Sequence, residues 1–387
     1  MDLRKWKITG FVFDTQPNRY PARKKDDELL EKSMNLASLL DTWGDTNVLA
    51  LAGALVGFIF GFAAQRSRFC TRAAVIDFCE GQTRERLSVW WLAFGACLVG
   101  VQALVFWGWL KPADARYIAM PGSISGAVLG GLLFGAGMIL TRGCASRLLI
   151  LSASGNLRAV LTGLVFAVTV QASISGWLAP VRRAVVGWWP VDGGPSRDLL
   201  HITGLGATGG LVLALLALGT GFYFFFKAHP QRWGLSTLAL VTGLSIALGW
   251  GLTQAIASTS FEAIQIQSLS FSSASAEMLM RVLSSATSPS LGFDAGLLPA
   301  TFIGSLLGAL VGGEFKFEGF KTENKLGHYL TGAVLMGFGA VLAGGCTVGA
   351  GLTGGSIFSV TAWLTLIAIW LGAGISWRIH RSMGWAM

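Results

Sequence analysis

The chain carries few charged residues. Asp, Glu, Lys and Arg make up only 13% of its 387 residues, whereas soluble domains contain about 25%. Hydrophobic residues account for 53%, and the mean hydropathy is +0.60. This composition excludes a soluble globular domain and a disordered or collagen-like chain, and it predicts an all-α integral membrane protein.

Cysteine, histidine and the motifs of common enzymes are also scarce. Five cysteines do not form a disulfide scaffold, and three of them lie in apolar, glycine-rich runs, which favours free thiols. Neither a CxxC nor an HExxH motif occurs, so we expect no metal site. The sequence contains no catalytic triad, phosphate loop or nucleotide-binding motif, so we predict no enzymatic activity and no cofactor.

Positive charge gathers in the N-terminal segment. The formal net charge is +9, and residues 1–45 form a polar, basic segment without the apolar core of a secretory signal, which we interpret as a tail. A basic tail beside a bilayer contacts anionic lipid or sets orientation. We therefore expect the lipid bilayer as a partner and expect no nucleic acid. Loop charges do not distinguish the two sides of the membrane.

Long apolar runs, by contrast, are abundant. A spanning helix needs about 20 apolar residues, and nine runs qualify, at 47–64, 88–110, 122–141, 158–180, 204–227, 236–256, 293–312, 328–344 and 358–377. Four shorter pieces follow clusters of small residues or arginine, at 70–80, 145–155, 272–285 and 348–356. Because they are too short to cross the bilayer, we expect them to be re-entrant helices covered by protein.

Two glycine-rich motifs recur at a constant offset. FGAGMILTRGC (134–144) and MGFGAVLAGGC (336–346) share two glycine positions and end on Gly-Cys, 202 residues apart. The same offset aligns QRSRFC (65–70) with QSLSFS (267–272), which pairs Cys70 with Ser272. This register predicts a duplication, with membrane repeats at 46–203 and 229–387 and a linking helix at 204–228. Because a single span separates four-span halves, we expect two inverted, pseudo-symmetric halves.

The predicted breaks concentrate polar residues within the membrane region. A helix that begins there presents unpaired N–H groups and a partial positive charge, which is an anion site. Charge at this depth is usually retained for function, although arginine can also extend to the headgroups, as we expect for Arg72 and Arg158. The candidate substrate-binding residues at the four breaks are Gln65, Arg66, Arg68, Cys70, Gly143, Cys144, Ser146, Arg147, Gln267, Ser270, Ser272, Gly345, Cys346 and Thr347.

The thiols at the breaks indicate the chemistry of the ligand. We expect Cys97 and Cys79 to act as small hydrophobic residues, whereas Cys70, Cys144 and Cys346 lie at the breaks. A neutral thiol is a weak, polarizable donor that suits a soft sulfur or selenium anion. A hard anion such as sulfate prefers backbone N–H groups and arginine. The pattern therefore predicts a site for a soft anion.

GFAAQRSRFC, GAGMILTRGCASR and MGFGAVLAGGCTVGAGLTGG resemble the three cysteine motifs of the YeeE/YedE sulfur transporters, which include the bacterial thiosulfate transporters. The resemblance covers nearly everything after residue 45. It implies an hourglass-shaped protein of the bacterial inner membrane, in which thiosulfate passes along a central route by successive S–H···S hydrogen bonds to Cys70, Cys144 and Cys346. It also implies a soluble sulfur-carrier protein as a partner.

The segment after Cys144 departs from that family. The chain reads ASRLLILSASGNLRA, where the thiosulfate branch usually continues with glycine, threonine and an aromatic residue. The leading hypothesis is import of thiosulfate or a related sulfur anion, with Arg147 adjusting specificity toward another sulfur oxyanion, a persulfide or a selenium compound. Two alternatives are a membrane sulfur-transferase or redox protein with a low-pKa thiol that carries persulfide sulfur, and a structural membrane protein without a substrate.

Overall fold

The computed structural model describes residues 40, 42–81, 85–284, 291–319 and 326–383. The predicted tail, residues 1–45, lies outside this part of the chain except for its last few residues. All the long elements in the described ranges are α-helices, and nine segments there are long and apolar enough to cross a membrane. The predictions of an all-α membrane protein and of nine spans are therefore confirmed.

The long helices agree with the nine predicted spans to within a few residues at most ends. They are α2 (Asp45–Arg66), α4 (Arg86–Phe106), α6 (Ile124–Leu140), α8 (Leu157–Ile174), α11 (Gly206–Ala228), α12 (Trp233–Thr259), α14 (Phe293–Val311), α15 (Leu326–Leu342) and α16 (Val360–Ser382). One boundary differs more: the run at 158–180 is divided into α8 and a separate short helix, α9 (Ala179–Val186). Gly176 lies between the two helices, in a turn after the C-cap Ser175.

Glycine allows the long helices to pack closely. A Cβ atom at Gly53, Gly57 or Gly61 of α2 would collide with backbone carbonyl groups of α14. Gly296 and Gly304 of α14 face the backbone of α2 in the same way. Small residues at such spacing permit the backbone approach on which helix association in lipid depends, which explains why α2 and α14 form the most extensive helix pair.

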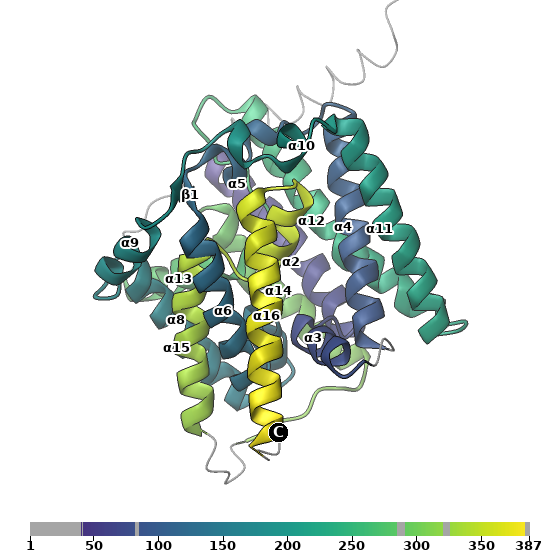
Figure 1. Cartoon of the computed structure of the whole chain (residues 1–387), viewed down its shortest axis with the longest axis vertical. Helices are drawn as coiled ribbons and strands as arrows, with labels where there is room; N and C mark the ends of the chain where they lie inside the picture. Colours follow the sequence, from purple (N-terminus) through teal and green to yellow (C-terminus); the bar gives the residue numbers. More distant parts are fainter. Residues whose placement is uncertain (1–39, 41, 82–84, 285–290, 320–325, 384–387) are drawn as a thin grey trace, which may run out of the picture.

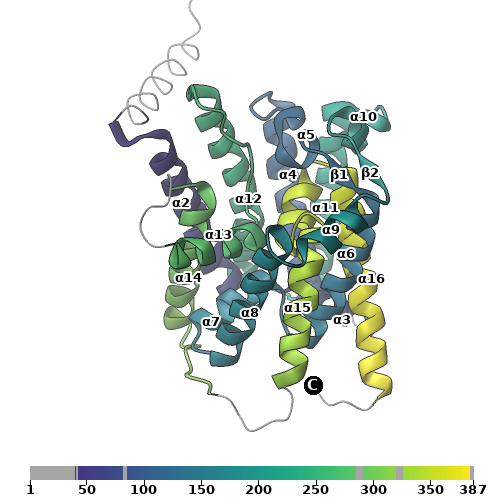
Figure 2. The same ribbon diagram turned by 90° about the vertical axis from the view of Figure 1, so that its left-hand side faces the viewer.

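Two groups of helices stand side by side on opposite flanks. Helix α6 packs against α15 and α16 on one flank, and α4 packs against α11 and α12 on the other (Figure 1). Near one end of the long helices lie α5 (Arg116–Ala119), α10 (Leu199–Ile202) and an antiparallel pair of strands, β1 (Gly122–Ser123) and β2 (Pro190–Val191) (Figure 2). The 3₁₀ helices η1 (Pro112–Asp114) and η2 (Pro195–Arg197) belong to the same connections.

Four short helices follow four of the long ones. They are α3 (Thr71–Cys79), α7 (Ala145–Ala153), α13 (Phe271–Leu283) and the π-helical η3 (Thr347–Gly354). Helices α3, α7 and η3 follow α2, α6 and α15 after tight turns, whereas α13 follows α12 only after the non-helical segment 260–270. The structure therefore contains a short helix at each predicted break.

Candidate functional site

The three motif cysteines share one local position. Cys70, Cys144 and Cys346 are the N-cap residues of α3, α7 and η3. Each has an extended or nearly extended backbone and lies directly before a turn of unpaired N–H groups. Cys346 Sγ accepts a hydrogen bond from Gly349 N at 3.4 Å. The thiols therefore lie where a helix N-terminus favours negative charge.

The N-cap of the fourth short helix is Ser270. The offset of 202 residues pairs Cys70 with Ser272, but Ser272 lies within the first turn of α13, with its Oγ 3.4 Å from Ser270 Oγ. The local geometry therefore matches Cys70 with Ser270. Segment 260–270 accounts for the difference, because its extended path into α13 replaces the tight turn that precedes α3.

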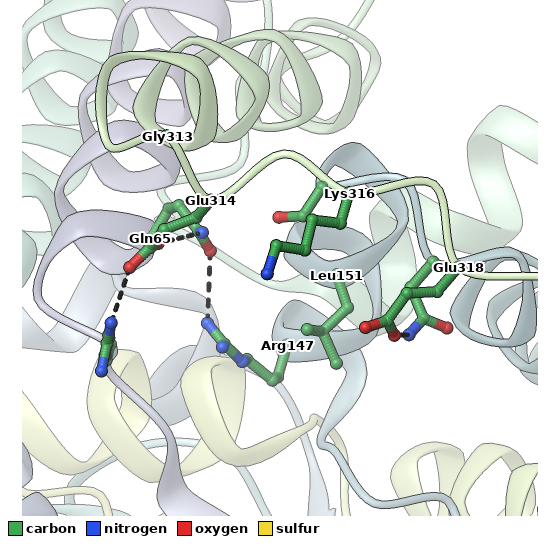
Figure 3. A pocket seen from close by; sticks show the side chains of 10 residues that line it. Gln65, Arg147, Leu151, Gly313, Glu314, Lys316 and Glu318 are labelled. Atoms are coloured by element: carbon green, nitrogen blue, oxygen red, sulfur yellow. Dashed lines mark hydrogen bonds and ion pairs between the residues drawn. The ribbon is translucent and has the colours of Figure 1, made fainter.

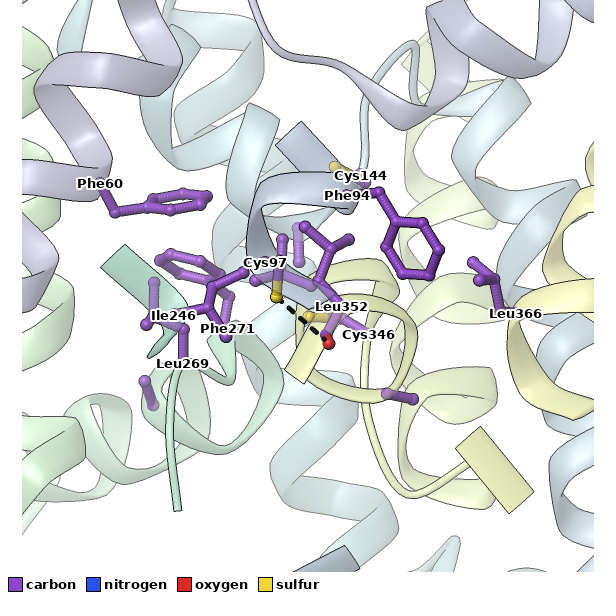
Figure 4. Packing of buried hydrophobic residues seen from close by; sticks show 14 of the residues in the cluster. Phe60, Phe94, Cys97, Cys144, Ile246, Leu269, Phe271, Cys346, Leu352 and Leu366 are labelled. Carbon is purple, nitrogen blue, oxygen red and sulfur yellow. Dashed lines mark hydrogen bonds between the residues drawn. The ribbon is translucent and has the colours of Figure 1, made fainter. Parts of the chain in front are cut away.

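Cys144 lies among polar groups of three short helices. Its Sγ is 3.3 Å from Ser146 Oγ, and the thiol also neighbours Cys70 and Thr347. Cys70 is half-buried, whereas Cys144 and Cys346 are 1% and 0% exposed. Thr347 is fully buried, and its Oγ1 makes no hydrogen bond of normal geometry with any described residue. The side chains of α3, α7 and η3 thus meet in the interior (Figure 4).

The other two cysteines have different surroundings. Cys97 is fully buried in α4 and donates a hydrogen bond to the carbonyl group of Leu352 at 3.7 Å. Cys79 is half-buried at the end of α3 and lines an apolar cavity of about 430 Å³ with Trp90 and Trp370. Neither is an N-cap residue, which agrees with their interpretation as small hydrophobic residues.

Tyr117 of α5 closes the group around Cys346. Its hydroxyl faces Ser270 and Cys346. A Cβ atom at Gly345 or Gly349 would come within 2.9 or 3.0 Å of this hydroxyl, so both glycines are needed for the approach. Burial raises the pKa of Tyr117 well above its usual range, and the phenol therefore remains a hydrogen-bond donor.

Arginine binds both of the motif glutamines. Arg116 Nη1 donates to Gln267 Oε1 at 3.2 Å. Arg147 Nη1 donates to Gln65 Oε1 at a longer distance, 3.4 Å. Both glutamines lie shortly before a short helix, and Gln65 is only 4% exposed. The offset that aligns them in sequence therefore also identifies two similar polar contacts.

A polar cavity opens beside the first two breaks. We call this cavity, of about 340 Å³, the vestibule; it is lined by Gln65, Arg68, Arg147, Leu151, Ser154, Asn156, Gly313, Glu314, Lys316 and Glu318 (Figure 3). Glu314 accepts hydrogen bonds from Gln65 Nε2 at 2.9 Å and from Arg68 Nη2 at 2.8 Å. The vestibule thus combines three cations with two carboxylates.

Several predicted residues lie outside the vestibule lining. Arg66 is half-buried and packs against Gly312 at the end of α14. The carbonyl group of Gly143 accepts a hydrogen bond from Thr141 Oγ1 at 2.8 Å, which stabilises the turn before Cys144. Arg142 and Arg158 both lie over the ring of Tyr329, at 5.8 and 4.7 Å from its centroid. The arginines at the breaks therefore divide between the vestibule and Tyr329.

The sequence analysis did not find Tyr117, Arg116, Glu314 or Lys316. All four lie in connections rather than in the glycine-cysteine motifs. Charged residues in connections are usually solvated, so their residue type gave no signal. The offset of 202 offers one weak sign, because it pairs Arg116 with Glu318, and each lies beside one of the two polar sites.

The nine spans and the buried polar helix termini define a multi-pass membrane protein. The sequence profile of the sulphur transport family matches residues 66–375, so the chain belongs to this family, also known as YeeE/YedE. The chain is 25% identical over 360 residues to the thiosulfate transporter TsuA of Escherichia coli (strain K12), covering 86% of this chain and 95% of the relative. It is 27% identical over 351 residues to TsuA of Spirochaeta thermophila, covering 85% and 98%.

Proposed function

We propose that the protein is a permease of the bacterial inner membrane that imports thiosulfate or a related sulfur-containing anion. The observation that carries this proposal is the meeting of three short-helix N-termini at Cys70, Cys144 and Thr347, with Cys346 next along the chain. Helix N-termini favour an anion, and neutral thiols suit its soft sulfur atom. The two relatives named as thiosulfate transporters support the choice of substrate.

The proposed route runs from the vestibule past Cys70, Cys144 and Cys346 to Tyr117. Along it, thiols would contact the sulfur atom of the anion, while the hydroxyl groups of Ser146, Thr347 and Ser270 would donate to its oxygens. Because Cys144 and Cys346 are enclosed by protein, passage requires neighbouring side chains to move apart. Such enclosure also replaces the hydration shell of the anion with fixed donors.

We further propose that the short helices are re-entrant and that the two halves form an inverted repeat. Three observations support this arrangement. Helices α6 and α15 begin 202 residues apart, as do α7 and η3. The packing of α2 on α14 has a counterpart in α12 on α4, and that of α6 on α16 in α15 on α8. A broken backbone at membrane depth is tolerated where protein covers it, and Cys144 and Cys346 are covered.

The experiment is uptake of labelled thiosulfate by proteoliposomes that contain the purified protein. We expect concentrative or equilibrating uptake that Cys144→Ala and Cys346→Ala reduce to the level of empty liposomes. Cys79→Ala is the matched control, because Cys79 lies outside the proposed route. Wild-type uptake that equals empty liposomes would reject thiosulfate as substrate, and equal uptake by both route variants would reject the cysteine route.

The same assay defines the range of substrates. Unlabelled sulfite, sulfate, sulfide and selenium analogues, added as competitors, rank the anions that the protein binds. Because the segment after Cys144 contains Arg147, which lines the vestibule, we expect substitution of Arg147 to change this ranking. A soluble sulfur-carrier protein remains part of the proposal as an acceptor on the inner side.

A further inference from the structure

The carboxylate of Glu314 occupies the position of an anion in the vestibule. Its Oε1 accepts from Arg68 Nη2 at 2.8 Å, and its Oε2 accepts from Gln65 Nε2 at 2.9 Å (Figure 3). Gln65 and Arg68 are two of the donors that the sequence assigns to the substrate. Both are therefore already bound to a negatively charged group of the protein itself.

The rest of the vestibule retains an excess of positive charge. Arg147 reaches only the amide oxygen of Gln65, at 3.4 Å. Lys316 forms no hydrogen bond or ion pair within the described residues. Glu318 accepts from the neutral amide of Asn156 at 2.7 Å. If the carboxylate of Glu314 left the cavity, its lining would present three cations and one carboxylate, a field that favours an incoming anion.

Glu314 is held in a way that permits its side chain, but not its backbone, to move. The side chain of Arg68 is 75% exposed and that of Glu314 is 27% exposed, so water screens their ion pair and its contribution is small. The backbone is fixed on both sides, because Glu314 N donates to Ala309 O at 2.8 Å and Lys316 N donates to Ser154 O at 3.2 Å. Rotation of the side chain alone would therefore release both donors.

We infer that Glu314 is an internal competitor of the substrate, whose carboxylate must be displaced before an anion enters the route. The anion it imitates is an oxyanion with at least two terminal oxygens, which would replace Glu314 Oε1 and Oε2. Arg68 lies two residues before Cys70, and Arg147 lies three residues after Cys144. An oxyanion bound by these arginines is thus delivered beside the first two thiols. This inference rests on the proposed function and adds a specificity-determining residue to it.

The affinity of the vestibule depends on how often Glu314 is displaced. When the binding-competent state is only partly populated, the apparent affinity falls in proportion to that population. Minor states of this kind are populated at about 0.1–10%. Removal of the competing charge should therefore strengthen binding, whereas removal of an ordinary stabilising ion pair would leave binding unchanged or weaken it.

The test compares Glu314→Gln with Glu318→Gln. Glutamine has nearly the same shape as glutamate and can still accept from Arg68, but it carries no charge. We expect Glu314→Gln to lower the KM for thiosulfate uptake by about tenfold without raising the maximal rate. Glu318→Gln removes a carboxylate of the same cavity that contacts neither Gln65 nor Arg68, and we expect its KM to change by less than about twofold.

Equilibrium binding separates this inference from the transport proposal. Sodium thiosulfate and sodium sulfate are titrated calorimetrically into detergent-purified wild type and Glu314→Gln. Tighter binding by Glu314→Gln supports the inference even if proteoliposomes show no uptake. An unchanged or weaker binding constant in Glu314→Gln overturns it even if the wild type transports thiosulfate. Absence of binding in both proteins overturns it as well.

Discussion

Arg142 and Gly344 adopt the same left-handed backbone conformation, with φ values of 61° and 75°, at positions 202 residues apart. Each lies two residues before an N-cap cysteine, Cys144 or Cys346. Arg68, with φ of 54°, has the same relation to Cys70. The backbone therefore reverses in one way before each of the three cysteines, and this turn places the thiol at the start of the short helix.

The left-handed turn before Cys346 leads to a prediction about stability. A non-glycine residue in this conformation costs about 1–2 kcal/mol, so Gly344→Ala should lower the free energy of unfolding by about this amount. Gly163→Ala in α8 is the control, because Gly163 has no positive φ and its Cβ would enter open space. There the helix propensity of alanine should add about 0.5–1 kcal/mol.

Thermal unfolding of both variants in detergent measures this difference. The midpoint should fall for Gly344→Ala and should stay constant or rise for Gly163→Ala. Equal midpoints for the two variants would mean that the turn at Gly344 relaxes to another conformation.

Close packing of α2 and α14 leads to a second prediction. A Cβ atom at Gly53 would collide with the carbonyl group of Phe293, which belongs to the backbone and cannot rotate away. We expect Gly53→Ala to destabilise the protein by about 1–3 kcal/mol, as overpacking usually does. Gly219→Ala in α11 meets open space and should be harmless.

The measurement for Gly53→Ala is the fraction of monodisperse protein that survives graded heating in detergent. Survival equal to that of Gly219→Ala would show that α2 and α14 separate easily. The same two variants should differ little in KM for thiosulfate, because neither glycine lines the vestibule.

The soft-anion hypothesis makes a prediction about Cys144. Serine at this position keeps a hydrogen-bond donor of similar size but replaces a soft atom with a hard one. Cys144→Ser should therefore reduce thiosulfate uptake by about tenfold, which corresponds to about 1.4 kcal/mol, and should make sulfate a stronger competitor. Cys79→Ser is the control.

Competition curves for sulfate against labelled thiosulfate provide the measurement. If the ratio of the two affinities is the same in Cys144→Ser and in wild type, the sulfur atom of Cys144 does not select the substrate.

The sequence predicted the spans well because each depends on local composition. A run of about 20 apolar residues defines its own helix, and the small residues or arginines after it marked the four breaks. What local patterns could not provide is the contact between Gln65 and Glu314, which lie 249 residues apart in the chain. Glu314 follows Gly313 in a polar connection, and only the packing of α14 against α2 places it in the vestibule.

The position of Ser270 shows a different reason for error. The aligned motifs QRSRFC and QSLSFS predict equal geometry, and Ser272 was therefore paired with Cys70. Helix α2 extends to Arg66, directly before its turn, whereas α12 ends at Thr259 and leaves an extended segment. Sequence similarity aligned the motif letters, but the different helix ends shifted the N-cap by two residues.

Tyr117 provides the last prediction, because it joins the group at Cys346 without belonging to any motif. Its phenol is buried, and burial raises its pKa, so it remains protonated at neutral pH and donates at the end of the proposed route. Hydrogen bonds to charged groups contribute about 1.5–3 kcal/mol. Tyr117→Phe should therefore reduce the maximal rate of uptake by roughly tenfold to a hundredfold.

Phenylalanine fills the same space beside Gly345 and Gly349, so the fold of Tyr117→Phe should persist, and an unchanged unfolding midpoint checks this. Tyr223→Phe is the matched control, because Tyr223 is 63% exposed on α11. Wild-type uptake by Tyr117→Phe would show that the anion leaves the protein before it reaches α5. Loss of uptake in Tyr117→Phe alone would extend the route from the vestibule to the opposite end of the molecule, because α5 and α7 lie near opposite ends of the long helices (Figure 2).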